Sequence, residues 1–451
     1  MTASGADAAA GDGWPAPRLA WATVAVLAVA QGFNAVDRHL INLLVGPIKA
    51  DLHITDAQVG LLLGFSFAIF YTTFGVPVGR LADHYSRRLI IAAGTAFWSL
   101  MTVACGLAQT FAQLFGARVA VGAGEATLNP SGYSIIADLV PPARRAKPMG
   151  VFIMGHTIGQ AITLFAGGLF VQYLLVNDVT LALPGGLELR PWQIAFVVAG
   201  LPGLAIALLV LTIREPARRE TLVDPVTGSA AASVPLREVA AYIRRHASVY
   251  LPVFAGFAFV LLWHMGNTVW APTFLIRTYH FTPAKVGAVL GLMTLLFNSS
   301  GVVLAGALSE WFARRGHADA HLRAAFVGAA CALPFGIAAP LMPNEGLALL
   351  LLGPAFFFGS LPFTLGPAAM ASITPNQMRA QITAIYLLCI NLFGFGLGPW
   401  LMGKLTDRVF QDEALLRYGI ATTAALAVPV GLVFLGRALA HYRALLAPRA
   451  G

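Results

Sequence analysis

Charged residues are scarce in this chain of 451 residues. Asp, Glu, Lys and Arg together make up 11% of it, against roughly 25% in a typical soluble domain, while hydrophobic residues make up 58%. A water-soluble fold of this length could not bury so much apolar side chain, and several runs reach the ~20 residues needed to cross ~30 Å of hydrocarbon. The composition therefore excludes a soluble protein and predicts an all-α membrane protein with many spans.

Cysteine is rare as well. Three are present, each inside an apolar run: Cys105, Cys331 and Cys389. An odd number at wide spacing predicts neither a disulfide framework nor a metal site. His317 and His321 are four residues apart, as in a metal-binding pair, but no further ligand accompanies them. We therefore expect no metal and no other cofactor.

Motifs of enzymes and of ATP-driven pumps are missing too. No G-x-x-x-x-G-K-[ST] sequence occurs, so we do not expect ATP to drive the protein directly. No pattern of a nucleophile with its base is recognisable, so we expect no enzyme. The formal net charge of +9 is accounted for by basic cytoplasmic loops and attraction to anionic lipid, and nucleic acid is not an expected partner.

Twelve apolar runs lie between charged or proline-rich breaks. They cover residues 19–45, 57–80, 88–108, 111–137, 148–175 and 191–213, and then 248–276, 284–309, 322–342, 345–372, 379–404 and 416–438. The first run is too long for the core of a signal peptide and lacks a cleavage site of small residues, so we take it as a span. An even number of spans puts both termini on one side of the membrane. Lys and Arg are denser in the N-terminal tail and the even-numbered connections, which predicts cytoplasmic termini in the cell inner membrane.

The same breaks predict the domain organisation. A disordered cytoplasmic tail (1–18) precedes a six-helix bundle (19–213), a cytoplasmic linker (214–247), a second six-helix bundle (248–440) and a cytoplasmic tail (441–451). The later part of the linker, 236–246, has basic amphipathic character and is expected to lie along the membrane surface.

A charged loop between the second and third runs returns in the second half of the chain. Its residues are Gly79, Leu81, Asp83, Arg87 and Arg88, and then Gly306, Leu308, Glu310, Arg314 and Arg315. An echo at the same place in each half is typical of a duplicated transporter. We predict that the glycines allow close helix approach and that the charges form a gate at the cytoplasmic ends. The alternative is that these charges only set the topology.

Four charged residues fall inside predicted spans, where charge is costly and indicates function by default. They are Asp37 and Arg38 in the first span and Arg118 and Glu125 in the fourth. Arg118 and Glu125 are seven residues apart, about two helical turns, and share a face. Counted from the outer end of each span at 1.5 Å per residue, Asp37 lies at a depth of roughly 13 Å, Arg118 at roughly 10 Å and Glu125 at roughly 20 Å. Asp37 could therefore pair with either of the other two.

These four residues suggest a proton-coupling device. A carboxylate beside an arginine stays ionised, whereas one in an apolar cavity holds a proton. We therefore predict Asp37 and Glu125 as proton carriers, with Arg38 and Arg118 pairing with them or with an anionic head group. The alternative is a permanent salt-bridge cluster with a structural role only.

Other polar residues inside spans are predicted to contact a substrate. Asn129 and Tyr133 follow Glu125 by about one and two turns and extend its face. His156 lies between the glycines of the contact sequence Gly155-x-x-x-Gly159, and could join the proton path or be a core histidine. In the second half such residues are sparse: His264, Asn267, Asn298 and Asn391. Aromatic neighbours make that half apolar enough for a hydrocarbon tail.

Several motifs together resemble the Spinster-like branch of the major facilitator superfamily. The first half carries Asn34-x-x-Asp37-Arg38, the charged loop Gly79 to Arg88, Phe97-Trp98-Ser99, Gly122-x-Gly124-Glu125-Ala126, Ile135-Ile136-Ala137-Asp138-Leu139 and Arg214-Glu215-Pro216. The second half adds Gly398-Pro399-x-x-x-Gly403-x-x-x-Asp407, and the match is thin from 248 to 378. His39 and His84 depart from the pattern, since they stand where an aromatic residue and an arginine are usual in the family.

This resemblance implies a twelve-helix fold of two pseudosymmetric bundles with alternating access. It also implies export of amphipathic lipids such as lysophospholipids or sphingosine phosphate, with Asp37 and Glu125 in proton coupling. Within that branch the chain resembles a bacterial-type homologue.

Residues and resemblance together predict a proton-coupled secondary transporter, acting as an exporter or antiporter. Its substrate would be a lysophospholipid, a sphingolipid-like molecule or a hydrophobic drug-like compound, its other partners protons and membrane lipids, and its state a monomer. One alternative is proton-symport uptake of a small organic anion, which the apolar second half argues against. Another is a membrane receptor that does not transport, which the intramembrane charges argue against.

Overall fold

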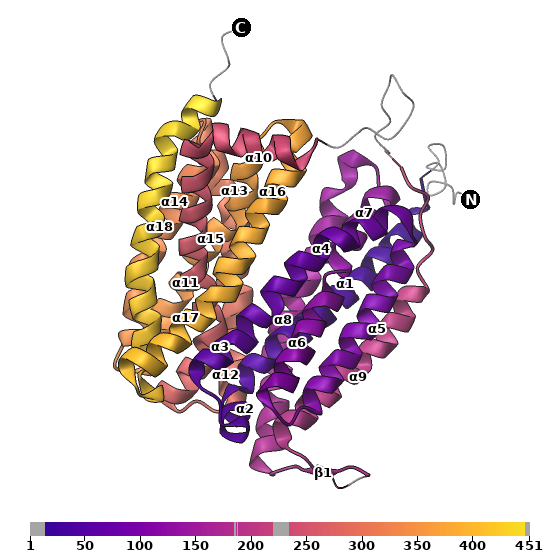
Figure 1. Cartoon of the computed structure of the whole chain (residues 1–451), viewed down its shortest axis with the longest axis vertical. Coiled ribbons are helices and arrows are strands. Elements are labelled where there is room, and N and C mark those ends of the chain that lie inside the picture. The colour runs from indigo at the N-terminus through magenta and orange to yellow at the C-terminus, as the bar shows by residue number, and fades with distance from the viewer. Residues whose placement is uncertain (1–13, 185, 187, 220–233, 447–451) are drawn as a thin grey trace, which may run out of the picture. The chain divides into compact units, whose positions relative to one another are not determined.

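The computed structural model describes residues 14–184, 186, 188–219 and 234–446, and helices dominate it (Figure 1). Among these residues, ten helical segments are long and apolar enough to cross a membrane. In the first half they are α1 (Pro17–His39) with η1 (Leu40–Leu43), α5 (Arg87–Gly106), α8 (Ala146–Val176) and α9 (Pro191–Leu211). In the second half they are α11 (Ala247–Tyr279), α12 (Pro283–Met293) with η4 (Thr294–Asn298) and α13 (Ser299–Arg314), α14 (Ala320–Leu341), α15 (Glu345–Ile373), α16 (Asn376–Ile390) with η5 (Asn391–Leu397), α17 (Gly398–Leu405) and η6 (Thr406–Phe410), and η7 (Glu413–Leu415) with α18 (Leu416–Leu446).

Two further spans consist of shorter pieces. One is α3 (Asp56–Gly60), η2 (Leu61–Phe65) and α4 (Ser66–His84), in which η2 is a π-helical turn; the other is α6 (Phe111–Glu125) followed by α7 (Leu128–Leu139). With these two, each of the twelve predicted apolar runs has its helix, with ends that differ by several residues.

Short elements connect the spans. They are α2 (Val45–Leu52), η3 (Pro142–Arg144), α10 (Leu236–Arg245) and the antiparallel pair β1 (Leu181–Ala182) and β2 (Glu188–Leu189). The amphipathic segment predicted at 236–246 is therefore helical. Local sequence fixes several helix starts, because Thr55, Ser86, Thr110 and Asn344 each accept a backbone N–H of the first turn.

Contacts within the chain define two compact units. Of the described residues, unit 1 takes those within Met1–Leu40, Phe70–Thr163 and Asp178–Ala231, and unit 2 takes those within Ile41–Ile69, Leu164–Asn177 and Ala232–Gly451. The start of α4 (residues 66–69) and the end of α8 (residues 164–176) thus group with the second half of the chain.

Glycines bring two helices of unit 1 together. A Cβ atom at Gly159 would lie 2.2 Å from the carbonyl oxygen of Gly32, and one at Gly155 would lie 2.3 Å from that of Ala28. α1 and α8 therefore pack backbone against backbone, as small residues allow in membranes. This confirms the close helix contact predicted from the glycines on either side of His156.

The two loop glycines are not packed within their own units. A Cβ atom at Gly79 or at Gly306 would meet no described atom within 4 Å. Their role in close helix approach therefore stays a prediction. Other glycines of unit 1, such as Gly94 against Thr127, carry the tight packing instead.

The core of unit 2 lies among α11, α14, α15, α16 and α18, which run side by side (Figure 1). Aromatic and aliphatic side chains fill it, including Phe257, Leu361 and Leu435. The polar end of a buried tyrosine is hydrogen-bonded within this core, since the hydroxyl of Tyr250 lies 2.9 Å from that of Thr374.

The Gly398-to-Asp407 motif packs against α3 within unit 2. A Cβ atom at Gly403 would lie 2.2 Å from the carbonyl oxygen of Asp56. The two carboxylate oxygens of Asp407 accept the N–H groups of Asp56 (3.1 Å) and Ala57 (2.7 Å). Asp407 thus caps the first turn of α3, where a helix favours negative charge.

Candidate functional site

The first and fourth spans bring two charges of unit 1 together. Nη2 of Arg38, in the last turn of α1, donates to Oε2 of Glu125, the last residue of α6, over 2.7 Å. The Glu125 side chain is fully buried and that of Arg38 is 18% exposed. Because Oε1 of Glu125 has no hydrogen-bond partner, Arg38 is the side chain that compensates this buried charge.

Asp37 differs from its paired neighbour. It is fully buried, and neither carboxylate oxygen has a hydrogen-bond partner of normal geometry, although Trp98 and Thr102 of α5 lie beside it. Nη1 of Arg118 donates to the backbone carbonyl of Asp37 over 2.9 Å and not to its carboxylate. Glu125 is the other carboxylate within electrostatic reach of Asp37. The four predicted residues therefore form one cluster, in which one carboxylate is paired and one is not.

A chain of polar contacts continues from this cluster. The guanidinium carbon of Arg38 lies 5.4 Å from the centroid of the Tyr71 ring, within cation–π range. Nδ2 of Asn129 donates to the Tyr71 hydroxyl over 2.7 Å, and Nε2 of Gln31 donates to Oδ1 of Asn129 over 3.2 Å. The structure therefore connects Asn129 to the charge pair through Tyr71.

The remaining predicted residues of unit 1 lie around aromatic rings. The ring centroids of His156 and His39 are 5.7 Å apart in an edge-on arrangement, and both residues are partly buried. Tyr133 is 37% exposed and its ring meets that of Phe152 edge-on at 5.3 Å. Tyr133 is thus the most exposed of the predicted substrate residues in this unit.

The asparagines of unit 2 mark irregular helix turns. Asn298 ends the π-helical turn η4, and Asn391 begins the π-helical turn η5. Such turns are frequent at functional sites. Asn267 is buried on α11, and its Nδ2 has no hydrogen-bond partner, as is true of Nδ1 of His264 one turn earlier.

The first charged loop is tied down within unit 1. Nε of the buried Arg87 donates to Oε1 of Glu215 over 2.8 Å, Nη1 bonds Asp138, and Nη2 donates to the carbonyl of Pro216 over 2.9 Å. The backbone N–H of Arg88 donates to Oε2 of Glu215 over 2.9 Å. The predicted gate residue Asp83 has its side chain outside the described part of the structure.

These contacts perturb Glu215. Burial alone would raise its pKa, but hydrogen bonds from the Arg87 side chain, the Arg88 backbone and the Ser86 hydroxyl outweigh burial and hold the pKa of Glu215 below its ordinary value. Glu215 is the middle residue of the Arg-Glu-Pro motif, and no local pattern indicates its partner Arg87, which is 128 residues away.

The second charged loop lies open. Glu310, Arg314 and Arg315 are exposed, and Arg315 stacks over the Trp311 ring at 3.7 Å. Its predicted gating contacts are not present among the described residues.

Sequence reasoning missed an ion cluster in unit 2. Asp56, fully buried, pairs with Nζ of Lys49 (2.6 Å) and with Nη1 of Arg277 (2.6 Å), and both cations also pair with Glu413. The position of Asp56 just after the helix-capping Thr55 was a signal that this carboxylate starts a helix.

It also missed Gln31 and Tyr71 in unit 1. Gln31 precedes Arg38 by seven residues, the same two-turn spacing that joined Arg118 and Glu125, so the signal was present. Tyr71 had none, because nothing in the chain order shows that its hydroxyl meets Asn129.

A many-helix membrane fold with charges buried inside its spans defines a secondary transporter. The model of the Major Facilitator Superfamily matches residues 27–399 of the chain. An "MFS-type efflux pump" of Mycolicibacterium smegmatis is 30% identical over 434 residues, which cover 95% of this chain and 94% of that protein. The chain therefore belongs to the Major Facilitator Superfamily, and it is a transporter and not an enzyme.

Two further likenesses narrow the branch. The crystal structure of a bacterial homologue of the human lysosomal transporter Spinster, inward-facing and unoccupied, superposes with a TM-score of 0.74 at 26% identity, covering 96% of this chain and 98% of that one. A "Probable L-galactonate transporter" of Escherichia coli is 25% identical over 430 residues, covering 92% of this chain and 90% of that protein. The protein is Spinster-like, as its motifs predicted.

Proposed function

We propose that this transporter is a proton-coupled exporter of an amphipathic compound, working by alternating access as an antiporter. The observation that carries the proposal is the Arg38–Glu125 pair, buried beside the unpaired carboxyl group of Asp37. Charges inside membrane spans are costly and mark function. A permanent structural cluster would be expected to pair both carboxylates, whereas here Arg118 bonds the backbone of Asp37 and leaves its carboxyl group alone.

The proton steps follow from these contacts. A proton on Oε2 of Glu125 removes the negative charge that holds Nη2 of Arg38, and the guanidinium is then available to an anionic head group. When Glu125 loses that proton, its negative charge attracts Arg38 and the ion pair forms again. Among the described residues no side chain forms an ion pair with the Asp37 carboxyl group, which makes it the second proposed proton carrier.

The substrate class rests on the surroundings of the pair and on the relatives. Arg38 and Arg118 suit an anionic head. Asn129 bonds Tyr71, whose ring lies beside Arg38, and Tyr133 follows Asn129 on α7. His156 faces His39, the residue after Arg38. Asn267, Asn298 and Asn391 remain predicted substrate contacts in an otherwise apolar part of unit 2. The relatives include an efflux pump and a Spinster homologue, and both favour a lysophospholipid, sphingolipid-like or drug-like cargo. Residence in the inner membrane with cytoplasmic termini, and a monomeric state, belong to the same proposal.

Proteoliposome flux tests the coupling. We expect Asp37→Asn and Glu125→Gln to bind a fluorescent lysophospholipid as wild type does, but to lose its accumulation against an imposed pH gradient. Glu188→Gln, a matched change of an exposed carboxylate in the β1–β2 hairpin, should accumulate normally. Undiminished accumulation by both core variants would remove these carboxyl groups as proton carriers.

Uptake of a small organic anion by proton symport is the second candidate, favoured by the two arginines and by the galactonate relative. The same vesicles decide between them. Acceleration of L-galactonate entry by inward proton flow, with no lysophospholipid flux, would replace the exporter with this symporter.

A further inference from the structure

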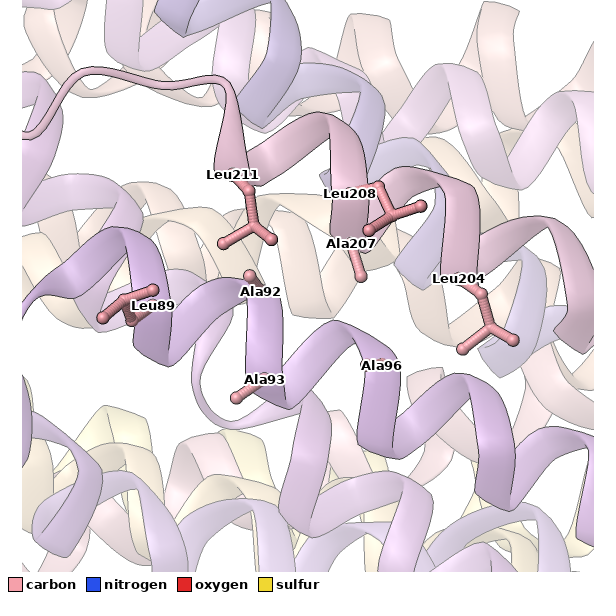
Figure 2. Close-up of a pocket in the computed structure, with 8 residues that line it drawn as sticks. All are labelled: Leu89, Ala92, Ala93, Ala96, Leu204, Ala207, Leu208 and Leu211. Carbon is pink, nitrogen blue, oxygen red and sulfur yellow. The ribbon is translucent and has the colours of Figure 1, made fainter.

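An apolar groove runs along the surface of unit 1, between α5 and α9. Its volume is about 480 Å³, and its lining contains only leucine and alanine: Leu89, Ala92, Ala93, Ala96, Leu204, Ala207, Leu208 and Leu211. Figure 2 shows the two helices side by side, with these side chains along them. Ala92 and Ala207 are buried and form its floor, while Leu89 and Leu208 are exposed at 53% and 67%. The small alanines leave the space and the leucines border it.

The groove lies in the part of the protein that faces hydrocarbon. α5 and α9 are both apolar enough to cross the membrane. The groove takes in Leu89 to Ala96 at the start of α5 and Leu204 to Leu211 at the end of α9, about two turns or ~10 Å of each helix. It therefore begins at the membrane surface and extends through much of one leaflet, which is about half of ~30 Å. Left empty, such a groove would lose dispersion contacts along its whole lining.

A cation stands at the surface end of the groove. Nη1 of Arg88 donates to the carbonyl oxygens of Leu211 (3.4 Å) and Ile213 (3.1 Å), which places the guanidinium beside Leu211 at the end of the groove. Nε of Arg88 is buried and has no hydrogen-bond partner.

Among the described residues of unit 1, no carboxylate forms an ion pair with the side chain of Arg88. The nearby carboxylates Glu215 and Asp138 both take the side chain of Arg87, and Glu215 meets Arg88 only through its backbone N–H. Arg88 thus offers a donor and a net positive charge directly above an apolar groove.

We propose that this groove is a binding site for one anionic phospholipid. Its phosphate lies on Arg88, and one acyl chain lies along the alanines between α5 and α9. A guanidinium matches phosphate geometry, and an acyl chain is the apolar filler that the bilayer supplies. The bound lipid bridges the start of α5 and the end of α9. With the termini on the predicted side, it comes from the cytoplasmic leaflet. The site is separate from Arg38 and Glu125 and does not depend on the proposed transport function.

Photo-labelling of the full chain in nanodiscs tests the site. The probe is phosphatidylglycerol with a diazirine in one acyl chain, compared with phosphatidylcholine carrying the same chain at equal mole fraction. Label on α5 and α9 is read by peptide mass spectrometry and normalised to the exposed Leu350 region of α15. We expect phosphatidylglycerol to label the groove about fivefold more than phosphatidylcholine, the preference that one cation near the surface gives.

Three variants separate the parts of the site. Ala93→Leu fills the groove and should lower its labelling by both lipids, whereas Ala205→Leu, the same change at an exposed position of α9 outside the groove, should not. Arg88→Gln should bring phosphatidylglycerol down to the phosphatidylcholine level, and Arg88→Lys should restore part of the difference. Equal labelling of wild type by the two lipids, or equal labelling of the Ala93 and Ala205 variants, would overturn the proposal. If Arg88→Gln does not fold, two comparisons still test the proposal: Ala93→Leu with Ala205→Leu, and phosphatidylglycerol with phosphatidylcholine.

Discussion

The two units place their charges differently. In unit 1, Glu125 lies midway along the α6–α7 span, and its partner Arg38 lies in the last turn of α1. In unit 2 the ion pairs gather at helix ends: Asp56 is the first residue of α3, and Asp319, which pairs with Arg323 and Arg443, immediately precedes α14. A charge at a helix end can keep water on one side, whereas one midway along a span depends on its protein partner. The Arg38–Glu125 pair of unit 1 thus fits the proposed proton coupling, whereas these pairs of unit 2 hold helix ends.

Helix irregularity differs between the units as well. The described π-helical turns η2, η4, η5 and η6 all belong to unit 2, and two of them begin or end at a predicted substrate asparagine. In unit 1 the interruption is the break between α6 and α7, directly after Glu125. Irregular turns in each unit therefore coincide with the residues proposed for function, which agrees with the general placement of such turns.

The largest effect should come from splitting the buried pair of unit 1. Arg38→Gln leaves the buried Glu125 without its compensating charge, and removing one partner of such a pair costs about 3–5 kcal/mol. We expect a marked fall in thermal stability in detergent and loss of proton-driven transport. The double variant Arg38→Gln/Glu125→Gln should regain stability but not transport.

The control is Arg144→Gln, at an exposed position in η3, which should change neither property. If the double variant is no more stable than Arg38→Gln, the two side chains are not energetically coupled, and the contrast between the units loses its main support.

The second effect tests the fixed charges of unit 2. Asp56→Asn removes the carboxylate shared by Lys49 and Arg277, and we expect a loss of about 3 kcal/mol, at the lower end for a buried pair because Glu413 remains. Lys285→Gln breaks a pair with Glu345 in which both side chains are about half exposed, and should cost about 0–1 kcal/mol. Thermal unfolding of the two variants measures the difference; similar losses would mean that burial does not distinguish these pairs.

The sequence predicted the fold well because the bilayer restricts the options. Apolar runs long enough to span it can only be helices, so twelve runs led to the helices of the structure. The same logic identified Arg38, Arg118 and Glu125 as a cluster, since charges inside spans must find partners. The choice of partner was not predictable. Asp37 and Arg38 are adjacent, about 100° apart around the helix, and only the rotation of α1 decides which one meets Glu125.

Other features depended on contacts far apart in the chain. Glu215 meets Arg87 across 128 residues, and no local pattern shows this. Repeated spacing marked Gly79 as a packing position in the sequence, but packing space is set by the neighbouring helix. Within unit 1 the described atoms leave Gly79 open, whereas Gly159 meets the backbone of α1. The π-helical turns also escaped prediction, because they arise from tertiary packing and leave no distinct periodicity.

A smaller effect should separate packed from unpacked glycines within unit 1. Gly159→Ala places a Cβ atom 2.2 Å from a backbone oxygen of α1, which neither helix can relieve without moving, so we expect a loss of about 1–3 kcal/mol. Gly116→Ala meets nothing within 4 Å in α6 and should be neutral or stabilising by up to about 1 kcal/mol. Opposite signs in thermal unfolding are expected, and equal effects would contradict the backbone contact between α1 and α8.

The smallest effect concerns pH and the tie between Arg87 and Glu215. Hydrogen bonds hold the pKa of Glu215 below its ordinary value, so its contribution to stability is present above the unfolded-state value of about 4.3 and is lost as the pH falls through the lowered pKa. Since the Glu215 side chain is 29% exposed, solvent screening limits the effect to about 1 kcal/mol. Thermal unfolding from pH 7 to pH 3 should therefore show wild type losing stability more steeply than Glu215→Gln, with the two curves converging at the acidic end. Parallel curves would show that Glu215 is no more than a neutral hydrogen-bond acceptor. The acid sensitivity of unit 1 would then have to come from the carboxyl groups inside its spans.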